Sequence, residues 1–244
     1  MKEDRTYIGL MDVLAANFDV MYGSGIRGHE MTLFEMHLPK PPARVLDVGC
    51  GTGRLLPWLS HMGYSVVGLE PSMEMDKMCK RRIKDDSLES VYSEKTEFLN
   101  SQLESESFDA VLMLGNLLGS IESRGITQNF LREAKRLLVP DGVFLVDASN
   151  IMYCGSILKC YQSMARHHMR FGDTVETVAV KGRDYRFFNH FFNVWDLSRR
   201  LSGMGFEVRG VYGADSIYKN GKLVCGARKY FMNPFFIAAF NSPY

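Results

Sequence analysis

The sequence predicts an α/β fold, a doubly wound and mostly parallel sheet with helices on both faces. Two observations lead to this prediction. Between residues 43 and 150, short apolar segments alternate with helical segments, which is the pattern of successive strand–helix–strand units. The first apolar segment, Arg44–Val48, runs directly into a glycine-rich turn, a typical strand-to-helix connection in such sheets. With 46% hydrophobic and 23% charged residues, the 244-residue chain also has ordinary globular composition.

Residues 43–150 are expected to form the core. Apolar segments predict strands at 44–48, 65–69, 90–92, 109–114 and 143–147, with helices between them at 53–62, 71–84 and 127–138. Turn and capping residues support these boundaries. Gly63 ends the first helix, Pro71 and Ser72 open the second, and Thr127 caps the third. The string Val139–Gly142 predicts a turn before the fifth strand.

The segments on either side of the core have other patterns. Residues 7–38 predict one or two amphipathic helices interrupted at Gly23–Gly25, so residues 1–42 are expected to form a helical lid. Residues 151–192 predict an inserted α+β substrate cap, with a helix at 151–169 and paired strands at 174–180 and 185–192. Residues 193–244 complete the core, with a helix at 194–204, strands at 205–212 and 235–240, and a hairpin at Asn220–Gly221.

Composition disfavours several classes of function. A formal charge of +1 lacks the basic excess of most nucleic-acid-binding proteins. No apolar run reaches the roughly 20 residues of a membrane span, and the polar start, Met1–Arg5, leads into no signal-peptide core. Five cysteines without a C-x-x-C pair favour reduced thiols in a cytoplasmic protein and predict no metal site. Whether the chain forms a homo-oligomer stays open.

Three glycines, Gly49, Gly51 and Gly53, follow the first strand at a spacing of two. Glycine suits such a turn because it adopts positive φ and lets a ligand approach the backbone, while the following helix directs unpaired N–H groups at that ligand. A dinucleotide-binding loop has the spacing G-x-G-x-x-G, whereas this loop is G-x-G-x-G and continues into the bulky Arg54. The spacing argues against a nicotinamide-dependent oxidoreductase, which we keep as an alternative.

The string Leu46–Gly53 resembles the first motif of the class I S-adenosylmethionine-dependent methyltransferases. The stretch Leu114–Asn116 is similar to small-molecule N-methyltransferases, including the glycine N-methyltransferase group. This resemblance implies a seven-stranded sheet of order 3-2-1-4-5-7-6 with the last strand antiparallel. It also implies an enzyme that uses S-adenosylmethionine to methylate a nucleophilic nitrogen or oxygen of a small molecule by in-line displacement.

The strand ends and the resemblance together indicate a cofactor site. Glu70 ends the second strand, and its two carboxylate oxygens match the two hydroxyls of a ribose. After the third strand, Glu94 is the first choice for reading the adenine amino group and Glu97 is the alternative. The resemblance matches Arg27 to a lid arginine that binds the methionine carboxylate, with a surface arginine as its alternative. The expected cofactor contacts are Arg27, Asp47, Gly49, Cys50, Gly51, Gly53, Glu70, Pro71, Met75, Glu94, Leu114, Gly115 and Asn116.

Three residues are candidates for the reaction centre: Asn116, Tyr22 and His190. Tyr22 is matched to a lid tyrosine that covers the cofactor, with a core tyrosine as its alternative. His190 is a candidate base, with a hydrogen-bonded structural histidine as its alternative. Alternation along the cap strand places Asn189 and His190 on opposite faces, without indicating which face lines the acceptor pocket. A noncatalytic protein that uses the cap for protein contacts is the last alternative, and the acceptor is not indicated.

Overall fold

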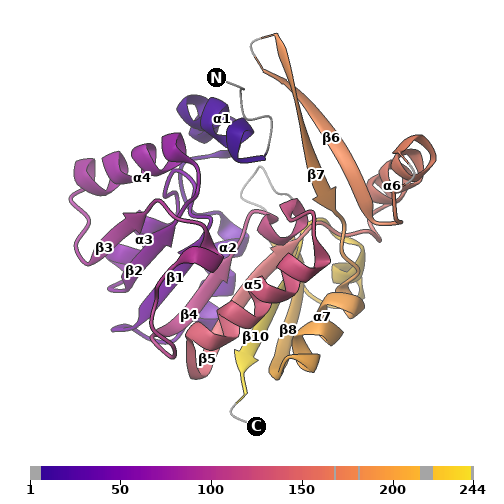
Figure 1. The fold of residues 1–244 in the computed structure, drawn as a ribbon. Coiled ribbons are helices and arrows are strands. Elements are labelled where there is room, and N and C mark those ends of the chain that lie inside the picture. Colours follow the sequence, from indigo (N-terminus) through magenta and orange to yellow (C-terminus); the bar gives the residue numbers. More distant parts are fainter. Residues whose placement is uncertain (1–6, 168, 181, 215–221, 243–244) are drawn as a thin grey trace.

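A sheet of eight strands, in the order β3-β2-β1-β4-β5-β10-β8-β9, forms the centre of the computed structural model, which describes residues 7–167, 169–180, 182–214 and 222–242 (Figure 1). The strands are β1 (Arg44–Val48), β2 (Ser65–Leu69), β3 (Val91–Glu94), β4 (Phe108–Met113), β5 (Leu138–Ala148), β8 (Phe206–Ala214), β9 (Leu223–Val224) and β10 (Phe235–Asn241). Strands β1 to β5 are parallel, and β10 runs antiparallel between β5 and β8. The expected order is confirmed, and β9 adds a short edge strand that the sequence did not predict.

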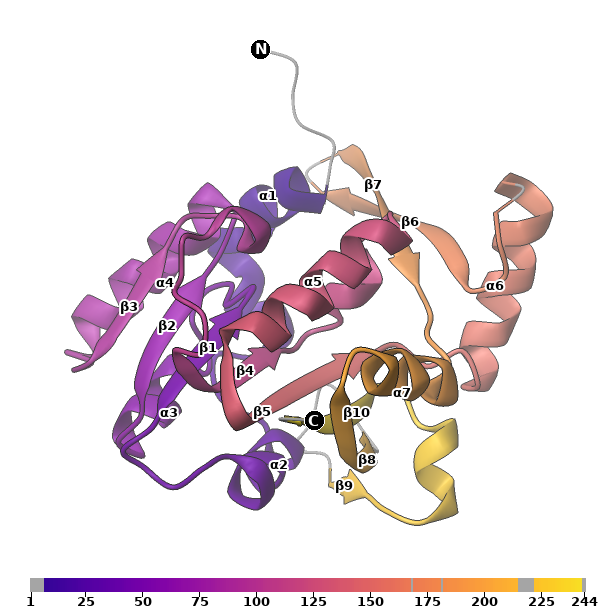
Figure 2. The same cartoon turned by 60° about the horizontal axis from the view of Figure 1, so that its bottom comes forward.

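Helices cover both faces of this sheet (Figures 1 and 2). The helices of the chain are α1 (Tyr7–Tyr22), α2 (Gly28–His37), α3 (Leu56–His61), α4 (Met73–Asp85), α5 (Arg124–Leu137), α6 (Cys154–His167) and α7 (Val194–Gly203). Apolar residues of α2, α3 and α4 are buried together against one face, and those of α5 and α7 against the other. The doubly wound arrangement is therefore confirmed.

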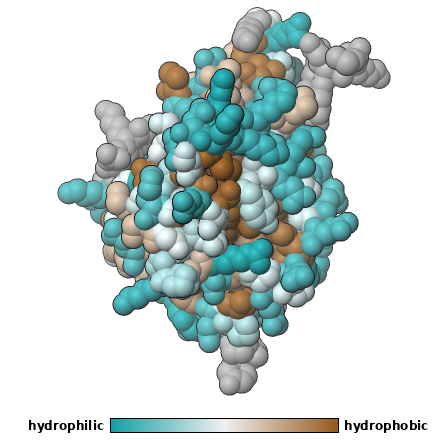
Figure 3. All heavy atoms as spheres, turned by 90° about the vertical axis from the view of Figure 1, so that its left-hand side faces the viewer, coloured by the Kyte–Doolittle hydropathy of each residue, from teal (hydrophilic) through white to brown (hydrophobic). Residues whose placement is uncertain are grey.

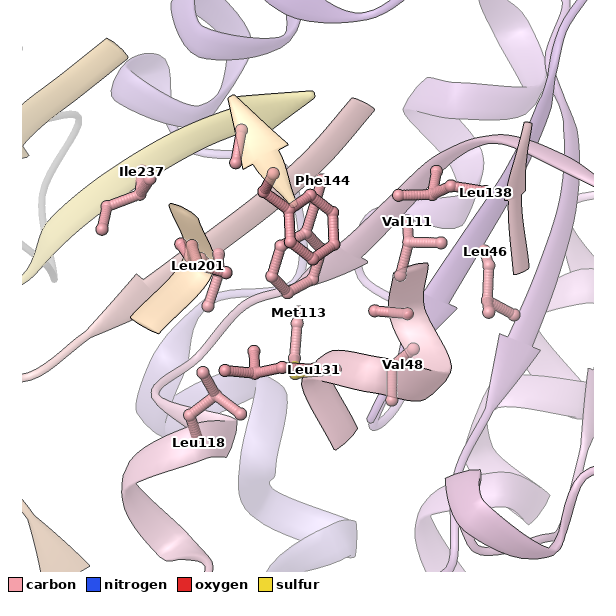
Figure 4. Packing of buried hydrophobic residues seen from close by; sticks show 14 of the residues in the cluster. Leu46, Val48, Val111, Met113, Leu118, Leu131, Leu138, Phe144, Leu201 and Ile237 are labelled. Carbon is pink, nitrogen blue, oxygen red and sulfur yellow. The ribbon is translucent and has the colours of Figure 1, made fainter. Parts of the chain in front are cut away.

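The cluster between the sheet and α5 and α7 holds the strands in place (Figure 4). Leu131 of α5 and Leu201 of α7 are fully buried, and Phe144 of β5 stacks on Phe206 of β8 with ring centroids 5.4 Å apart. Because apolar clusters lie on both faces, β1, β4 and β5 are buried along most of their length. This burial fixes the carboxyl ends of the central strands at one edge of the sheet.

Two core helices begin three residues away from their predicted starts. The first core helix begins at Leu56 rather than Gly53, because Gly53 has a φ of +77° and cannot belong to an α-helix. The third begins at Arg124, directly after Ser123. Thr127 is therefore not its cap, and its hydroxyl instead donates to the Ser123 carbonyl at 3.1 Å.

The predicted turn at Val139–Gly142 is also wrong, because these residues belong to β5. They form an irregular part of the strand, where the register with β4 shifts between Phe108 and Ala110. Asp141 has a φ of +60°, which a short polar side chain tolerates. Turn-forming residues are thus accommodated inside a bulged strand. The predicted hairpin at Asn220–Gly221 lies outside the described residues.

The segment between β5 and α7 stands over the carboxyl ends of the parallel strands (Figure 1). It consists of α6 and a separate hairpin of β6 (Asp173–Val180) and β7 (Arg183–His190), paired from Asp173↔His190 to Val180↔Arg183. Leu10 of α1, Met75 of α4 and Tyr185 of β7 belong to one buried cluster. The N-terminal segment and the inserted segment, which we label lid and cap after the prediction, therefore meet over the same edge of the sheet.

One face of the molecule shows how hydrophilic and hydrophobic side chains are distributed on the surface. On the side of β3 and α4, hydrophilic side chains cover most of the face and hydrophobic atoms show near its centre (Figure 3). Over the described ranges, no helix is both long and apolar enough to cross a membrane.

Candidate active site

The loop after β1 has the backbone conformation that its glycines predict. Gly49, Gly51 and Gly53 have φ values of +71°, +58° and +77°, a region that costs other L-residues about 1–2 kcal/mol. A Cβ on Gly53 would lie 2.8 Å from the Cys79 Sγ, whereas a Cβ on Gly51 would meet no atom within 4 Å. Gly53 is therefore required by packing, and Gly51 leaves open space that a ligand can approach.

Glu70 fastens this loop to the end of β2. Its Oε2 accepts a hydrogen bond from the Gly51 N–H at 2.9 Å, and its Oε1 accepts one from the Ser72 N–H at 2.8 Å. Burial raises the pKa of the Glu70 carboxyl, although both N–H groups lower it. Each carboxylate oxygen keeps a further lone pair, so Glu70 can hold the loop and still accept hydroxyl groups.

Asp47, near the end of β1, is only 3% exposed. Burial raises its pKa to about 7; the positive charge of Arg54 opposes this rise, and the negative charges of Glu30 and Glu70 add to it. An aspartate that is partly protonated at neutral pH responds strongly to a cation placed beside it. The electrostatics of Asp47 therefore suit a positively charged ligand.

A buried ion pair joins the loop to the lid. The Arg54 guanidinium donates to both carboxylate oxygens of Glu30, at 2.7 and 2.6 Å. Arg27 also points inward, with its guanidinium 3.5 Å from Glu30 Oε1 and 3.2 Å from the Tyr22 carbonyl oxygen. The expected methionine ligand Arg27 is thus already engaged within the lid. The ion pair between Glu30 and Arg54 was not predicted from the sequence, because the pattern of neither segment indicates that the two side chains meet.

The residues expected near the adenine differ in how deeply they are buried. Met75 is 1% exposed beneath α1, and Pro71 is partly buried. Glu94 and the alternative Glu97 are both exposed. The buried polar pair at the end of β3 is instead Ser93 and Asp76, whose hydroxyl and Oδ1 are hydrogen-bonded at 2.9 Å.

Cys50 takes part in the loop through its backbone. Its N–H donates to the Leu69 carbonyl at 3.1 Å, while its Sγ packs 3.9 Å from the Cys79 Sγ. A Cβ on Gly68 would come within 2.8 Å of the same sulfur. The thiol is therefore a packing group on the α4 side of the sheet.

At the end of β4, Leu114 is buried, and Gly115 and Asn116 have φ values of +79° and +62°. The Asn116 N–H donates to Asp147 Oδ1 at 2.7 Å. Its side chain spans two other segments, because Nδ2 donates to Asn189 Oδ1 at 2.9 Å and Oδ1 accepts from the Ser149 N–H at 2.8 Å. Asn116 thus holds β4, β5 and the cap together, and its amide is committed to protein partners.

Two acidic side chains of α1 anchor the lid over the loop. Asp19 Oδ1 accepts from the Thr52 hydroxyl at 2.5 Å, and Asp19 is also paired with Arg82 of α4. Asp12 Oδ1 accepts from the Ser72 hydroxyl at 2.5 Å. These contacts place α1 directly beside the residues that follow β1 and β2.

Tyr7 is a site residue that sequence reasoning missed. Burial raises its pKa to about 12, and the charges of Glu70, Tyr22 and Asp147 raise it further. Its ring lies 5.8 Å from that of Phe187 in the cap. Tyr22 packs against Phe18 at 4.7 Å. The pattern of α1 reveals an amphipathic helix but does not show which residue reaches the strand ends.

The structure does not bring His190 together with Asn116. Asn189 faces the strand ends, and His190 points to the opposite side of β7, where its Nδ1 lies 2.5 Å from Asp173 Oδ1. Burial lowers the pKa of His190, Asp173 raises it, and Arg124 and Arg200 lower it further. The face of β7 toward the strand ends is therefore the one with Tyr185, Phe187 and Asn189.

The methyltransferase domain family matches residues 46–146, which run from β1 through most of β5. Residues 46–146 are therefore a methyltransferase domain, and the solved structures similar to the chain include methyltransferases that depend on S-adenosylmethionine. The residues of the site fit this cofactor, because the open cradle at Gly51 adjoins two buried carboxyl groups, Asp47 and Glu70. This result overturns the alternative of a nicotinamide-dependent oxidoreductase. The G-x-G-x-G spacing of the loop had already argued against that class of enzyme.

The chain is also similar to relatives and to solved structures. An uncharacterised protein of Methanocaldococcus jannaschii is 26% identical over 212 residues, covering 84% of this chain and 77% of that protein. The uncharacterised methyltransferase YodH of Bacillus subtilis is 30% identical over 107 residues, covering 44% of this chain and 43% of that protein. A crystal structure of a methyltransferase from Methanosarcina mazei has the same fold, with a TM-score of 0.70, 18% identity and coverage of 86% and 97%.

Proposed function

We propose that this methyltransferase acts on a nucleophilic nitrogen or oxygen of a small molecule held between α1, the β6–β7 hairpin and the ends of β4 and β5. The observation that carries the proposal is the cover over the strand ends. Tyr7 packs against Phe187, and Asn116 is hydrogen-bonded to Asn189. Lid and cap cover the strand ends, which favours a molecule of limited size. A net charge of +1 lacks the basic excess of most nucleic-acid-binding proteins. We also propose that the protein is located in the cytoplasm.

S-adenosylmethionine, when bound, supplies a methyl group activated by its sulfonium. The role of the chain is to hold the two reactants in line, which contributes about 7–11 kcal/mol in well-oriented intramolecular reactions. In our proposal, the Gly49–Gly53 loop, Asp47 and Glu70 bind the cofactor, and the β4 end at Leu114–Asn116 lies beside its methionine part. Arg27, Pro71, Met75 and Glu94 are assigned as outer cofactor contacts.

Tyr7 and Asp147 are the groups that we assign to the acceptor. The Tyr7 hydroxyl stays neutral because burial raises its pKa to about 12, so it can donate and accept hydrogen bonds. Burial raises the pKa of Asp147 to about 6, although N–H groups of Asn116 and Gly115 lower it, so this carboxyl is mostly ionised at neutral pH. Together they can orient an N–H or O–H group so that its lone pair faces the methyl group. In this proposal, Asn116 and Tyr22 are positioning residues and His190 has no part.

Transfer of a labelled methyl group tests the acceptor class. The enzyme is incubated with methyl-labelled S-adenosylmethionine and either the dialysable or the nondialysable fraction of a cell extract. We expect label in molecules of the dialysable fraction. Label confined to protein or nucleic acid would overturn the small-molecule assignment.

The Tyr7→Phe variant then tests the acceptor side of the site. It should transfer methyl groups more slowly with unchanged cofactor affinity. Tyr92→Phe serves as the matched control, because Tyr92 is exposed on β3. Equal rates in Tyr7→Phe and wild type would remove Tyr7 from the proposal.

A further inference from the structure

A cavity of about 540 Å³ lies on the far side of the cap hairpin from Asn189. Its volume is within the usual range for small-molecule sites, about 300–1,000 Å³. Four separate parts of the chain line it. They are residues 121–125 with Thr127 at the start of α5, Met169, Arg170 and Asp173 before and in β6, the His190 face of β7 with Phe192, and Arg200 of α7. The β7 strand separates this cavity from the Asn116–Asn189 bond.

Three arginines line the cavity from different elements: Arg124 of α5, Arg170 before β6, and Arg200 of α7. Besides burial, which is the main cause, Arg124 and Arg200 each lower the pKa of His190. Their charges therefore act on the same ring from two helices. Cations gathered in this way repel one another unless an anion lies between them.

The acidic residues nearby neutralise only part of this group, because their hydrogen bonds go to His190 and Arg200. Asp173 is engaged with His190, and Arg200 Nε donates to Asp196 Oδ2 at 2.8 Å. Glu122 is the other acid that lines the cavity. Within the described part of the chain, the side chains of Arg124 and Arg170 make no hydrogen bond or ion pair, so their donors remain available to a ligand.

Aromatic rings form another wall. Phe188 and Phe192 line the cavity, and the Phe192 ring lies edge-on to His190 with centroids 4.5 Å apart. A simple inorganic anion would use the arginines and leave this wall uncovered. Apolar surface next to guanidinium groups suits a molecule that has both an anionic group and a ring.

We propose that this cavity is a second ligand site, which binds a small anion with an apolar body, such as an aryl carboxylate. The anionic group lies between Arg124, Arg200 and His190, and the apolar body lies against Phe188 and Phe192. The site is separate from the cofactor and acceptor sites and does not depend on the identity of the acceptor.

Three probes test the proposal with the full chain: benzoate, benzyl alcohol and inorganic phosphate. Binding is followed by calorimetry and by the ring C–H signal of His190 in NMR spectra, assigned with His190→Gln. Benzoate should bind more tightly than either other probe and should shift the His190 signal. Equal binding of benzoate and benzyl alcohol, equal binding of benzoate and phosphate, or an unmoved His190 signal would overturn the proposal.

A pair of variants on α5 separates the site from general surface charge. Arg124→Gln should weaken benzoate binding about tenfold through loss of a charge-assisted hydrogen bond. Arg132→Gln removes an exposed arginine of the same helix that does not line the cavity and should leave binding unchanged. S-adenosylhomocysteine affinity, measured alongside, should be the same in both variants. Unchanged benzoate affinity in Arg124→Gln, or an equal loss in both variants, would contradict the site.

Discussion

The side-chain amides of Asn116 and Asn189 are joined by a hydrogen bond of 2.9 Å between Nδ2 and Oδ1. This bond connects the end of β4 to the cap, across 73 residues of sequence. Asn189 Nδ2 continues the network to Glu176 Oε1 at 3.1 Å. The distance between the cap and the cofactor edge therefore depends on a pair of amides rather than on apolar packing alone.

Asn189→Ala should separate cap positioning from cofactor binding. The change leaves the Asn116 amide without its cap partner, so the free energy of unfolding should fall by about 1–3 kcal/mol and methyl transfer should slow. Cofactor affinity should not change, because Asn189 lies on the cap. Urea unfolding and calorimetry with S-adenosylhomocysteine measure both quantities, with Asn129→Ala, at an exposed position of α5, as control. A parallel loss of cofactor affinity would contradict this division.

Asp47 should make cofactor affinity depend on pH. Its pKa is about 7 without cofactor, mainly through burial, and we expect the cationic cofactor to favour the ionised form. Below that pH, binding must expel a proton, so affinity should rise by up to about thirtyfold between about pH 5.5 and 8. Calorimetry across this range should show a flat profile for Asp47→Asn. In the control Asp147→Asn, cofactor affinity should still depend on pH. Loss of the pH dependence in both variants would contradict the assignment of this effect to Asp47.

The same raised pKa has an effect on folding. An acid whose pKa is higher in the folded state favours folding while it is protonated, and this contribution is lost as the pH rises through the folded-state value. The cofactor-free protein should therefore become less stable as the pH rises from the ordinary aspartate range to about 7. Thermal unfolding of wild type and Asp47→Asn, compared at several pH values, checks this expectation. A wild-type curve parallel to that of the variant would refute it.

The Glu30–Arg54 pair should matter more than exposed pairs. The Glu30 side chain is 2% exposed and that of Arg54 13%; burial opposes ionisation of Glu30, yet Arg54 and Arg27 lower its pKa overall. Arg54→Met leaves the buried carboxylate of Glu30 without its main partner, so the free energy of unfolding should fall by about 3–5 kcal/mol. Adding Glu30→Gln should restore part of the loss. Lys77→Met, in a half-exposed pair of α4, should cost under about 1 kcal/mol, and an equal cost for both would be contrary to this account.

Gly51 should be more important for the cofactor than for folding. Gly51→Ala adds a Cβ at a φ of +58° in open space, so it should cost about 1–2 kcal/mol of stability while abolishing cofactor binding by filling the cradle. Gly25→Ala, at a glycine with open space and no such φ, should change neither. Chemical unfolding and calorimetry distinguish these effects. Normal cofactor affinity in Gly51→Ala would show that the cofactor does not approach this backbone.

The positions of the strands and of the glycine-rich loop could be predicted because both depend on local patterns, whereas the order of the strands was implied by the family resemblance. Apolar runs marked the strands, and Gly51 and Glu70 were expected near each other because parallel strands end at one edge. Tyr7, the Glu30–Arg54 pair and the Asn116–Asn189 bond could not be predicted in the same way. Each depends on how the lid or cap packs on the core, and periodicity shows only which face of an element is buried.

The most direct test of the central claim is calorimetric titration of S-adenosylhomocysteine into the wild type and Glu70→Gln. The wild type should bind one equivalent, and the variant should bind about tenfold more weakly because it loses a charged acceptor at the end of β2. NADH, titrated in the same way, should give no binding heat. Absence of S-adenosylhomocysteine binding to the wild type, or equal affinity in Glu70→Gln, would contradict a cofactor site at the ends of β1 and β2.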